Sequence, residues 1–417
     1  MKILLSAYAC EPGKGSEQGV GWHWATQLAH LDHDVFVITR ANNQVCIENA
    51  LADARLDGLQ FRYYDLPRWA MRWKRGPRGV HLYYVLWQAG AYRLAKRLVA
   101  ETKFDVVHHL TFGVFRQPSF MGRLGIPFIV GPIGGGEAVP ASLRKSLPFR
   151  GRAQERFRDL SNRLASFDPF VSAMLTQAAL IFCKTQETFD LLPATCKNRS
   201  RIHLEIGLEP ERIRRQAEGA AIEPAFLYAG RLIYWKGVQL ALRALAELKR
   251  TNRAATLAII GKGPHEAWLK RLARSLGVER SVQWMGWVPH GDLWDHYSRY
   301  SAFVFPSLHD SSGNVLLEAM SQGLPVICID TGGPGAVVPH SAGIKVQAAG
   351  RSQAQVVTDI AAAMQTLTDS PELRARMSQG ALEFARASTW NDVVTSAYAG
   401  VEDALNPRRM DILAGAS

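Results

Sequence analysis

Two cations stand five residues apart at the end of a predicted strand in the second half of the chain. Arg231 and Lys236 follow the apolar run 225–229 and precede Gly237. A guanidinium offers a planar fork to phosphate oxygens and an ammonium offers a point charge, so together they could neutralise a departing diphosphate. Taken alone, either cation would be interpreted as an ordinary surface residue. Their joint position indicates a phosphate site.

A second polar cluster surrounds a short helix predicted to follow the strand 302–306. Ser311 or Ser312 is expected to cap the helix, and Gly323 to end it before the next strand begins at Pro325. The two serines can accept hydrogen bonds from the first free N–H groups of the helix. This arrangement predicts a loop, a helix and a strand in close succession.

Two carboxylates flank the start of this helix. Asp310 precedes Gly313 and Asn314, and Glu318 follows them by one turn. The free N–H groups and positive dipole end of a helix favour phosphate or sugar hydroxyls. Glu318 shares a helix face with Asn314 and Gln322, so a solvated surface remains the alternative.

The N-terminal strand leads into a glycine-rich turn over 8–22. The glycines at 13, 15 and 19 fit the dinucleotide fingerprint loosely, and no acidic residue closes the second strand. A P-loop also fails, because Lys14 is followed by Gly15 and Tyr8 stands where the first P-loop glycine belongs. The turn therefore predicts neither a dehydrogenase nor a P-loop nucleotidase.

Two further polar segments of the first half follow predicted strands. His108 and His109 end the strand 105–109, and the run 131–137 contains three consecutive glycines and Glu137. Strand alternation places the histidines on opposite sides, and a lone histidine is more often structural than functional. The glycines allow close approach of a ligand, but a tight turn explains them equally well.

These motifs lie on a repeating pattern of predicted elements. Short apolar runs bounded by Gly or Pro alternate with helical stretches. This pattern is typical of a doubly wound parallel α/β sheet, in which ligands lie at the carboxyl ends of the strands. Predicted strands of the first half are 2–7, 35–39, 105–109, 127–130, 180–184 and 201–205; those of the second half are 225–229, 256–260, 282–284, 302–306 and 325–329. Helices are expected over 238–251, 265–276 and 391–405.

The length of 417 residues fits two domains. A charged linker near 207–222 separates the two strand series. We expect an N-terminal domain over 1–207, a C-terminal domain over 208–389, and a last helix and tail over 390–417 that packs back on the first domain.

The composition excludes several classes of protein. Five scattered cysteines without a C-x-x-C pair suggest free buried thiols rather than disulfides or a zinc site. No apolar run reaches the ~20 residues that span a bilayer, so we expect a cytoplasmic protein. The net charge of +12 implies an anionic partner, but no nucleic-acid-binding motif is present.

One basic and aromatic segment favours a membrane surface. Between Arg62 and Arg78 lie six cations, one acid (Asp65) and five interleaved aromatic or methionine side chains. Cations attract anionic headgroups, and Trp and Tyr prefer that interface. We expect peripheral attachment to the inner face of the cytoplasmic membrane; a solvated loop is the alternative, because Pro67 and Pro77 prevent one continuous helix.

Taken in order and spacing, the motifs of the second half resemble those of retaining glycosyltransferase family 4. The glycine-rich turn 8–22 and the segments 105–113 and 131–137 of the first half resemble its bacterial surface-polysaccharide branch. The resemblance rests on 229–237 and 305–325 together with 259–264, 286–289 and 330–334. It implies the GT-B fold, an α/β architecture of two facing Rossmann-like domains with a deep cleft between them.

The resemblance also implies roles for individual residues. Arg231 and Lys236 bind the donor pyrophosphate, Glu318 holds the ribose hydroxyls, and the backbone of Gly313, Asn314 and Val315 meets the phosphates and sugar. Asp310 stands where the family usually has Glu and faces the sugar. In the first half, Gly15 and Ser16 lie near the phosphates, and His109, preferred over His108, contacts the transferred sugar.

The reaction implied is transfer of a hexose from a nucleoside-diphosphate sugar to a hydroxyl of a glycan or lipid-linked glycan, without metal or other cofactor. Arg231, Lys236, Asp310 and His109 are the expected catalytic residues. The alternatives are a GT-B-like nucleotide-sugar epimerase, a phosphorylase, and a non-catalytic sugar-nucleotide-binding module, since fold alone excludes none of them.

Overall fold

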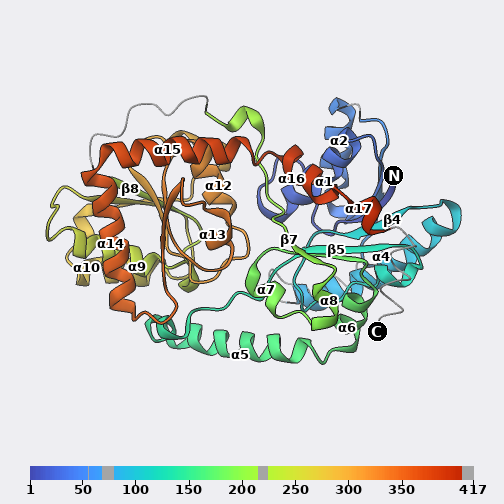
Figure 1. Ribbon diagram of the computed structural model, residues 1–417, viewed down its shortest axis with the longest axis horizontal. Coiled ribbons are helices and arrows are strands. Elements are labelled where there is room, and N and C mark those ends of the chain that lie inside the picture. Colours follow the sequence, from blue (N-terminus) through green and yellow to red (C-terminus); the bar gives the residue numbers. More distant parts are fainter. Residues whose placement is uncertain (55, 68–78, 215–223, 406–417) are drawn as a thin grey trace. The chain divides into compact units, whose positions relative to one another are not determined.

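The computed structural model describes residues 1–54, 56–67, 79–214 and 224–405 (Figure 1). The chain divides into two compact units. The first unit comprises residues 1–136, 160–206 and 390 onward, and the second comprises 137–159 and 207–389. The segment 137–159 thus groups with the second unit although it precedes the charged linker, whose residues 215–223 lie outside the described ranges.

The first unit is built on a parallel sheet of seven strands among its described residues, in the order β3-β2-β1-β4-β5-β6-β7. The strands are β1 (Lys2–Ser6), β2 (Asp34–Thr39), β3 (Leu59–Tyr63), β4 (Val106–His109), β5 (Phe128–Ile133), β6 (Leu180–Cys183) and β7 (Ser200–Ile202). Its helices are α1 (Ser16–His30), α2 (Gln44–Ala54), α4 (Val80–Glu101), α6 (Pro169–Gln177), α7 (Gln186–Asp190), α8 (Ala194–Lys197), α16 (Trp390–Tyr398) and α17 (Val401–Ala404). The helix α5 (Phe149–Ala165) has residues in both units.

The second unit repeats this construction with six described strands in the order β10-β9-β8-β11-β12-β13, again all parallel. The strands are β8 (Ala225–Ala229), β9 (Thr256–Ile260), β10 (Val282–Gly286), β11 (Ala302–Phe305), β12 (Val326–Ile329) and β13 (Gly343–Val346). Its helices are α9 (Val238–Leu248), α10 (Glu266–Ser275), α11 (His290–Tyr297), α12 (Asn314–Ser321), α13 (Gly332–Val337), α14 (Gln353–Asp369) and α15 (Pro371–Arg386).

The predicted strands are present in both halves, and two edge strands, β3 and β13, were not predicted. The expected helix over 391–405 is divided into α16 and α17, because Gly400 adopts a φ of +70° between them. The five cysteines are free, as expected, although Cys46 is only partly buried. No described helix is long and apolar enough to cross a membrane.

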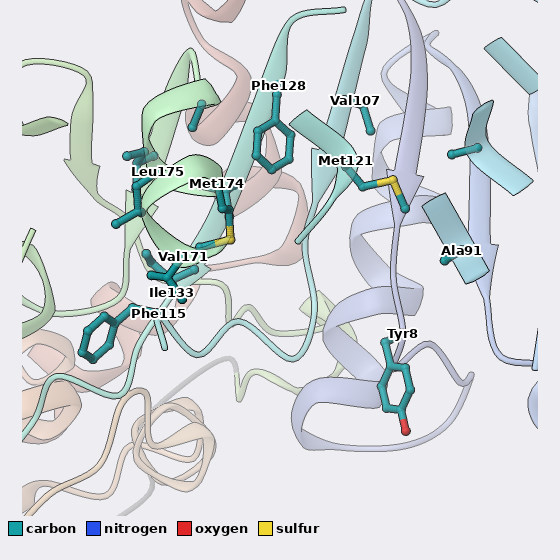
Figure 2. Packing of buried hydrophobic residues seen from close by; sticks show 14 of the residues in the cluster. Tyr8, Ala91, Val107, Phe115, Met121, Phe128, Ile133, Val171, Met174 and Leu175 are labelled. Atoms are coloured by element: carbon teal, nitrogen blue, oxygen red, sulfur yellow. The ribbon is translucent and has the colours of Figure 1, made fainter. Parts of the chain in front are cut away.

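One hydrophobic cluster of the first unit lies on one face of its sheet (Figure 2). Val107 and Phe128 contribute from the neighbouring strands β4 and β5, and Met174 and Leu175 contribute from α6. Tyr8, two residues beyond the end of β1, packs edge-on against Tyr84 of α4, with ring centroids 5.1 Å apart. This packing fixes the loops that leave the carboxyl ends of the strands.

The C-terminal helix α16 belongs to the first unit. Trp390 stacks on His23 of α1 with ring centroids 4.4 Å apart, and the Tyr398 hydroxyl lies 2.9 Å from Nδ1 of His108 on β4. Residues from the two ends of the described chain therefore share one core.

Candidate functional site

The loops after β8 and β11 meet at one edge of the second sheet, because these strands are neighbours and run parallel. The backbone N–H of Leu308 donates to the carbonyl of Trp235 at 2.7 Å, and the Ser307 hydroxyl donates to the same carbonyl at 3.3 Å. These bonds join the segment that carries Arg231 and Lys236 to the segment that carries Asp310.

Gly237 allows the two loops to approach this closely. Its φ is +72°, and a Cβ at this position would lie 1.7 Å from the carbonyl oxygen of Pro306. No side chain fits in that space, and the left-handed conformation also favours glycine. The spacing of Lys236 from the loop after β11 thus depends on one glycine.

Lys236 and Asp310 form an ion pair, in which the Lys236 ammonium donates to a carboxylate oxygen of Asp310. Both side chains are about four-fifths buried. The same ammonium lies 5.0 Å from the centre of the Phe305 ring, which adds a cation–π contact. Arg231 is exposed to solvent. The site therefore combines one paired, partly buried cation with one cation that projects from the strand end.

A third cation, Lys262, lies beside these loops; it belongs to the motif 259–264, but the sequence did not indicate a role for it. It is exposed between Gly261 and Gly263, whose added Cβ atoms would meet the carbonyl oxygens of Gly230 and Leu232 at 2.0 and 2.3 Å. The Leu232 N–H donates to the Lys262 carbonyl at 3.1 Å. The signal available in the sequence was a lysine between two glycines at a neighbouring strand end.

The helix α12 begins differently from the expectation. Its N-cap is Gly313, with φ +91°, and no side chain caps it, so the prediction that Ser311 or Ser312 is the cap was wrong. The Ser311 hydroxyl instead donates to the Glu137 carboxylate at 2.9 Å. Without a side-chain cap, the backbone at Asn314 and Val315 stays available to an external acceptor.

Glu318 is held by two side chains that sequence reasoning missed. Nε2 of His290 lies 2.9 Å from one carboxylate oxygen, and the Tyr297 hydroxyl donates to the other at 3.1 Å. The hydrogen bond to Glu318 raises the pKa of His290 above its usual range, although partial burial opposes the shift. Tyr297 is fully buried, whereas His290 is about half exposed. Glu318 is thus a fixed acceptor with one buried and one exposed partner.

A buried polar network supports the same edge from the segment 137–159. The His309 ring lies 3.0 Å from Glu155, and the Tyr234 hydroxyl donates to the same carboxylate oxygen at 2.9 Å. Burial disfavours ionised Glu155, but its contacts with His309, Tyr234 and Arg158 together outweigh this effect and lower the pKa of Glu155. Arg158 contacts His309 Nδ1 at 2.6 Å and Glu137 at 3.6 Å. These residues hold the loop before Asp310 in place.

In the first unit, Gly15 and Ser16 lie at the start of α1, where the chain leaves β1. Ser16 has a φ of +59°, which is rare for a residue with a side chain. The neighbouring Gly19 and Gly21 pack so closely that an added Cβ would lie 2.2 and 2.0 Å from backbone oxygens. Ser16 and Gly15 are exposed at the carboxyl edge of the sheet.

The two histidines of β4 contact different partners. His108 contacts the Gly131 carbonyl at 2.8 Å and the Tyr398 hydroxyl at 2.9 Å, so both ring nitrogens have partners in the core. His109 contacts the Tyr84 hydroxyl through Nε2 at 3.0 Å, and its Nδ1 has no partner among the described residues. Burial lowers the pKa of His108 to about 4 and that of His109 to about 3, so both rings are neutral at pH 7.

The basic segment between Arg62 and Arg78 is described only to residue 67, and 68–78 lie outside the described ranges. Its one acid, Asp65, accepts from Arg40 at 3.1 Å and from the Tyr83 hydroxyl at 2.5 Å.

Among the described residues, no group of three His, Cys, Asp or Glu side chains is placed to hold a metal ion.

The second unit matches a known protein family. Residues 210–384 match the family described as "Glycosyl transferases group 1", so the resemblance expected from the motifs is confirmed for this part of the chain. Glycogen synthase of Mycobacterium tuberculosis is 35% identical over 189 residues, which are 45% of this chain and 44% of that protein. The lipopolysaccharide core biosynthesis glycosyltransferase LpsD of Rhizobium meliloti is 31% identical over 174 residues, or 42% and 48% of the two chains. The matches thus span less than half the length of these relatives.

Similarity to solved structures extends over both units. Anabaena Alr3699/HepE, solved in complex with UDP, covers 97% of this chain and 100% of its own, with a TM-score of 0.61 and 15% identity. The lipopolysaccharide outer core galactosyltransferase WaaB covers 97% and 99%, with a TM-score of 0.61 and 14% identity. At this identity the likeness concerns the fold alone, and it confirms the GT-B fold with two parallel-sheet α/β domains.

Proposed function

We propose that this protein, whose residues 210–384 match the glycosyl transferases group 1 family, is a retaining glycosyltransferase. It moves a hexose from a nucleoside-diphosphate sugar to a hydroxyl of a glycan or lipid-linked glycan in surface polysaccharide synthesis. The observation that carries the proposal is the convergence of Arg231, the Lys236–Asp310 ion pair and the uncapped α12 N-terminus at one sheet edge.

The charges suit a departing diphosphate. As the bond between the anomeric carbon and the diphosphate oxygen breaks, negative charge grows on that oxygen, and Arg231 and Lys236 stabilise it. The acceptor oxygen forms the new bond to the same carbon, and its proton passes to the leaving diphosphate. Transfer on the face that the diphosphate leaves retains the anomeric configuration.

Asp310 and Glu318 serve different ends of the donor in this proposal. Asp310, shorter by one methylene than the glutamate usual in the family, binds hydroxyls of the sugar, and Glu318 binds the ribose. The backbone at Gly313, Asn314 and Val315 binds the phosphates and sugar. Gly15, Ser16 and His109 contribute from the first unit. His109 is uncharged at pH 7, which suits hydrogen bonding to a sugar rather than electrostatic attraction.

The relatives support this reading. Alr3699/HepE was solved with UDP and also with UDP and glucose, which makes UDP the first nucleotide to test. LpsD acts in lipopolysaccharide core biosynthesis, which supports a glycan acceptor at a membrane. The net charge of +12 supports attachment to an anionic membrane face.

A panel of UDP-, GDP- and ADP-sugars tests the proposal by thermal stabilisation. A ligand at 100 times its dissociation constant adds about 2.7 kcal/mol to the unfolding free energy. One nucleotide should stabilise the protein, and the donor should be consumed only when a hydroxyl acceptor is present, with retained configuration by NMR. Interconversion of the donor without acceptor indicates an epimerase, and binding without turnover of any acceptor indicates a binding module; either result rejects the proposal.

A further inference from the structure

A row of large apolar side chains is exposed to solvent on the helix α5. Phe149 and Phe157 are 77% and 73% exposed, Leu160 and Leu164 are more than half exposed, and Phe167, just beyond the helix, is 81% exposed. In the described ranges twelve large hydrophobic side chains are exposed, and six of them lie between residues 149 and 170. Single exposed apolar residues are normal, whereas such clustering marks an interaction surface.

The row follows the helical repeat. At about 100° per residue, positions 149, 157, 160 and 164 fall within an arc of about 80°. The opposite side of the helix is anchored: an added Cβ at Gly151 would lie 3.0 Å from the Tyr234 ring, and Glu155 accepts from the Tyr234 hydroxyl. Figure 1 shows α5 as one uninterrupted helix. The apolar row is therefore an outward face of a fixed element.

Cations border this row on both sides. Exposed arginines of α5 are Arg150, Arg152, Arg156 and Arg163. The two acids of the helix are engaged, because Glu155 is buried and Asp159 pairs with Arg144. The exposed surface of α5 is thus apolar along its centre and positively charged along its margins.

We propose that α5 lies in the interface of an anionic lipid bilayer, with its apolar row at the level of the first acyl carbons and its arginines among the headgroup phosphates. Amphipathic helices that bind membranes combine these two features. A second copy of this chain fits less well, because it would bring another molecule of charge +12 against a basic face. The inference rests on the proposed function, and it adds the surface that would bring the site to a lipid-linked acceptor.

Vesicle flotation of the full chain tests the proposal. The vesicles contain phosphatidylcholine with phosphatidylglycerol, or phosphatidylcholine alone as the neutral comparison. The wild type should float with the anionic vesicles at low salt and be released as salt rises. Two α5 variants, Phe157→Gln with Leu164→Gln, and Arg152→Gln with Arg156→Gln and Arg163→Gln, should each lower the partition coefficient at least about tenfold.

Matched control variants change the same number and kind of exposed residues elsewhere. They are Val45→Gln with Leu191→Gln, and Arg250→Gln with Arg271→Gln and Arg280→Gln. Both should float like the wild type. Equal loss in the controls would show a general effect of charge or hydrophobicity and overturn the proposal.

Three further results would also overturn the proposal: no flotation of the wild type, equal flotation of the α5 variants, or loss of flotation only when Arg68, Arg72, Lys74 and Arg75 are changed to Ser. A dimer in gel filtration that the α5 variants dissociate, without vesicle binding, would assign the face to a second copy. UDP titration of every variant separates this question from the proposed function. Absence of binding by the wild type to UDP, GDP and ADP alike, together with α5-dependent flotation, would reject the donor assignment alone.

Discussion

Lys236 and Asp310 are 74 residues apart in sequence and form one ion pair. Residues assigned to the diphosphate and to the sugar of the donor are therefore coupled before any ligand binds. A double-mutant cycle with Lys236→Ala and Asp310→Asn should give strongly non-additive effects on donor affinity. Titration of the four proteins with the same nucleotide sugar measures the coupling, and additive losses would show that the pair has no role in binding.

Removal of either cation should slow transfer more than it weakens binding. Arg231→Ala and Lys236→Ala should each lower kcat at least about 100-fold, because both act on charge that develops as the diphosphate leaves. Initial rates with the donor identified by thermal stabilisation provide the measurement. Arg271→Ala, an exposed cation of α10, is the control and should retain full activity. Wild-type turnover in the double variant Arg231→Ala, Lys236→Ala would reject the site.

Substitutions of the two carboxylates, Glu318 and Asp310, should affect the binding of different parts of the donor. Glu318→Gln should weaken binding of the bare nucleoside diphosphate, since we assign Glu318 to the ribose, whereas Asp310→Asn should mainly change discrimination between donor sugars. Isothermal titration with the diphosphate and with two sugar forms compares them. A larger loss of diphosphate affinity in Asp310→Asn would mean that the donor binds in the opposite orientation.

The contact between His290 and Glu318 should stabilise the fold at acidic pH. Since the pKa of His290 is raised in the folded protein, its contribution is complete below the ordinary histidine pKa of 6.5 and is lost as pH rises through the raised value. His290→Gln should therefore lower the unfolding free energy more at pH 6 than at pH 9, and modestly, because the ring is half exposed. Urea unfolding at both pH values measures the difference; an equal loss would contradict the assignment.

Buried His109 should make the unfolding free energy depend on pH in the opposite direction. Its folded pKa of about 3 lies below the ordinary value of 6.5, so the unfolded chain binds the additional proton and stability falls as pH drops from 6.5 toward 3. Each such group contributes a slope of about 1.4 kcal/mol per pH unit. The variant His109→Gln should reduce the slope of unfolding free energy against pH over that range. An unchanged slope would show that His109 becomes protonated in the folded state.

Gly237 and Gly350 offer a matched test of close packing, because their φ angles are +72° and +71°. Gly350→Ala has no neighbour within 4 Å and should cost only the conformational penalty of about 1–2 kcal/mol. Gly237→Ala adds the overlap with the Pro306 carbonyl and should cost at least about 2 kcal/mol more. Thermal unfolding of both variants compares them, and equal losses would mean that the loop after β11 moves aside freely.

The strands that carry the site could be predicted because each is an uninterrupted apolar run between glycine or proline residues, as in 225–229 and 302–306. The edge strands β3 and β13 have no such run. In β3 the exposed Gln60 alternates with buried Leu59 and Phe61, and in β13 Lys345 interrupts the apolar pattern. An edge strand is covered on fewer sides, so its sequence carries a weaker signal.

The partners of the site residues could not be predicted from local patterns. His290 precedes Glu318 by 28 residues and reaches it from another helix, so no helical spacing connects them. Similarly, Ser311 satisfies the local preference for a helix cap, but its hydroxyl contacts Glu137, which is 174 residues away. Local propensity predicted the helix α12 correctly but predicted the wrong hydrogen bond for Ser311, because a distant carboxylate competes for its hydroxyl.

The return of α16 to the first unit affects the order in which this protein can fold during synthesis. Trp390 and Tyr398 contribute to the core that contains β1 and β4, yet the ribosome makes them after the whole segment 207–389 of the second unit. At about 5–20 residues per second, those roughly 180 residues take on the order of 10–40 s. During that interval the nascent first unit exposes the surface that α16 later covers, whereas the second unit can complete its sheet first.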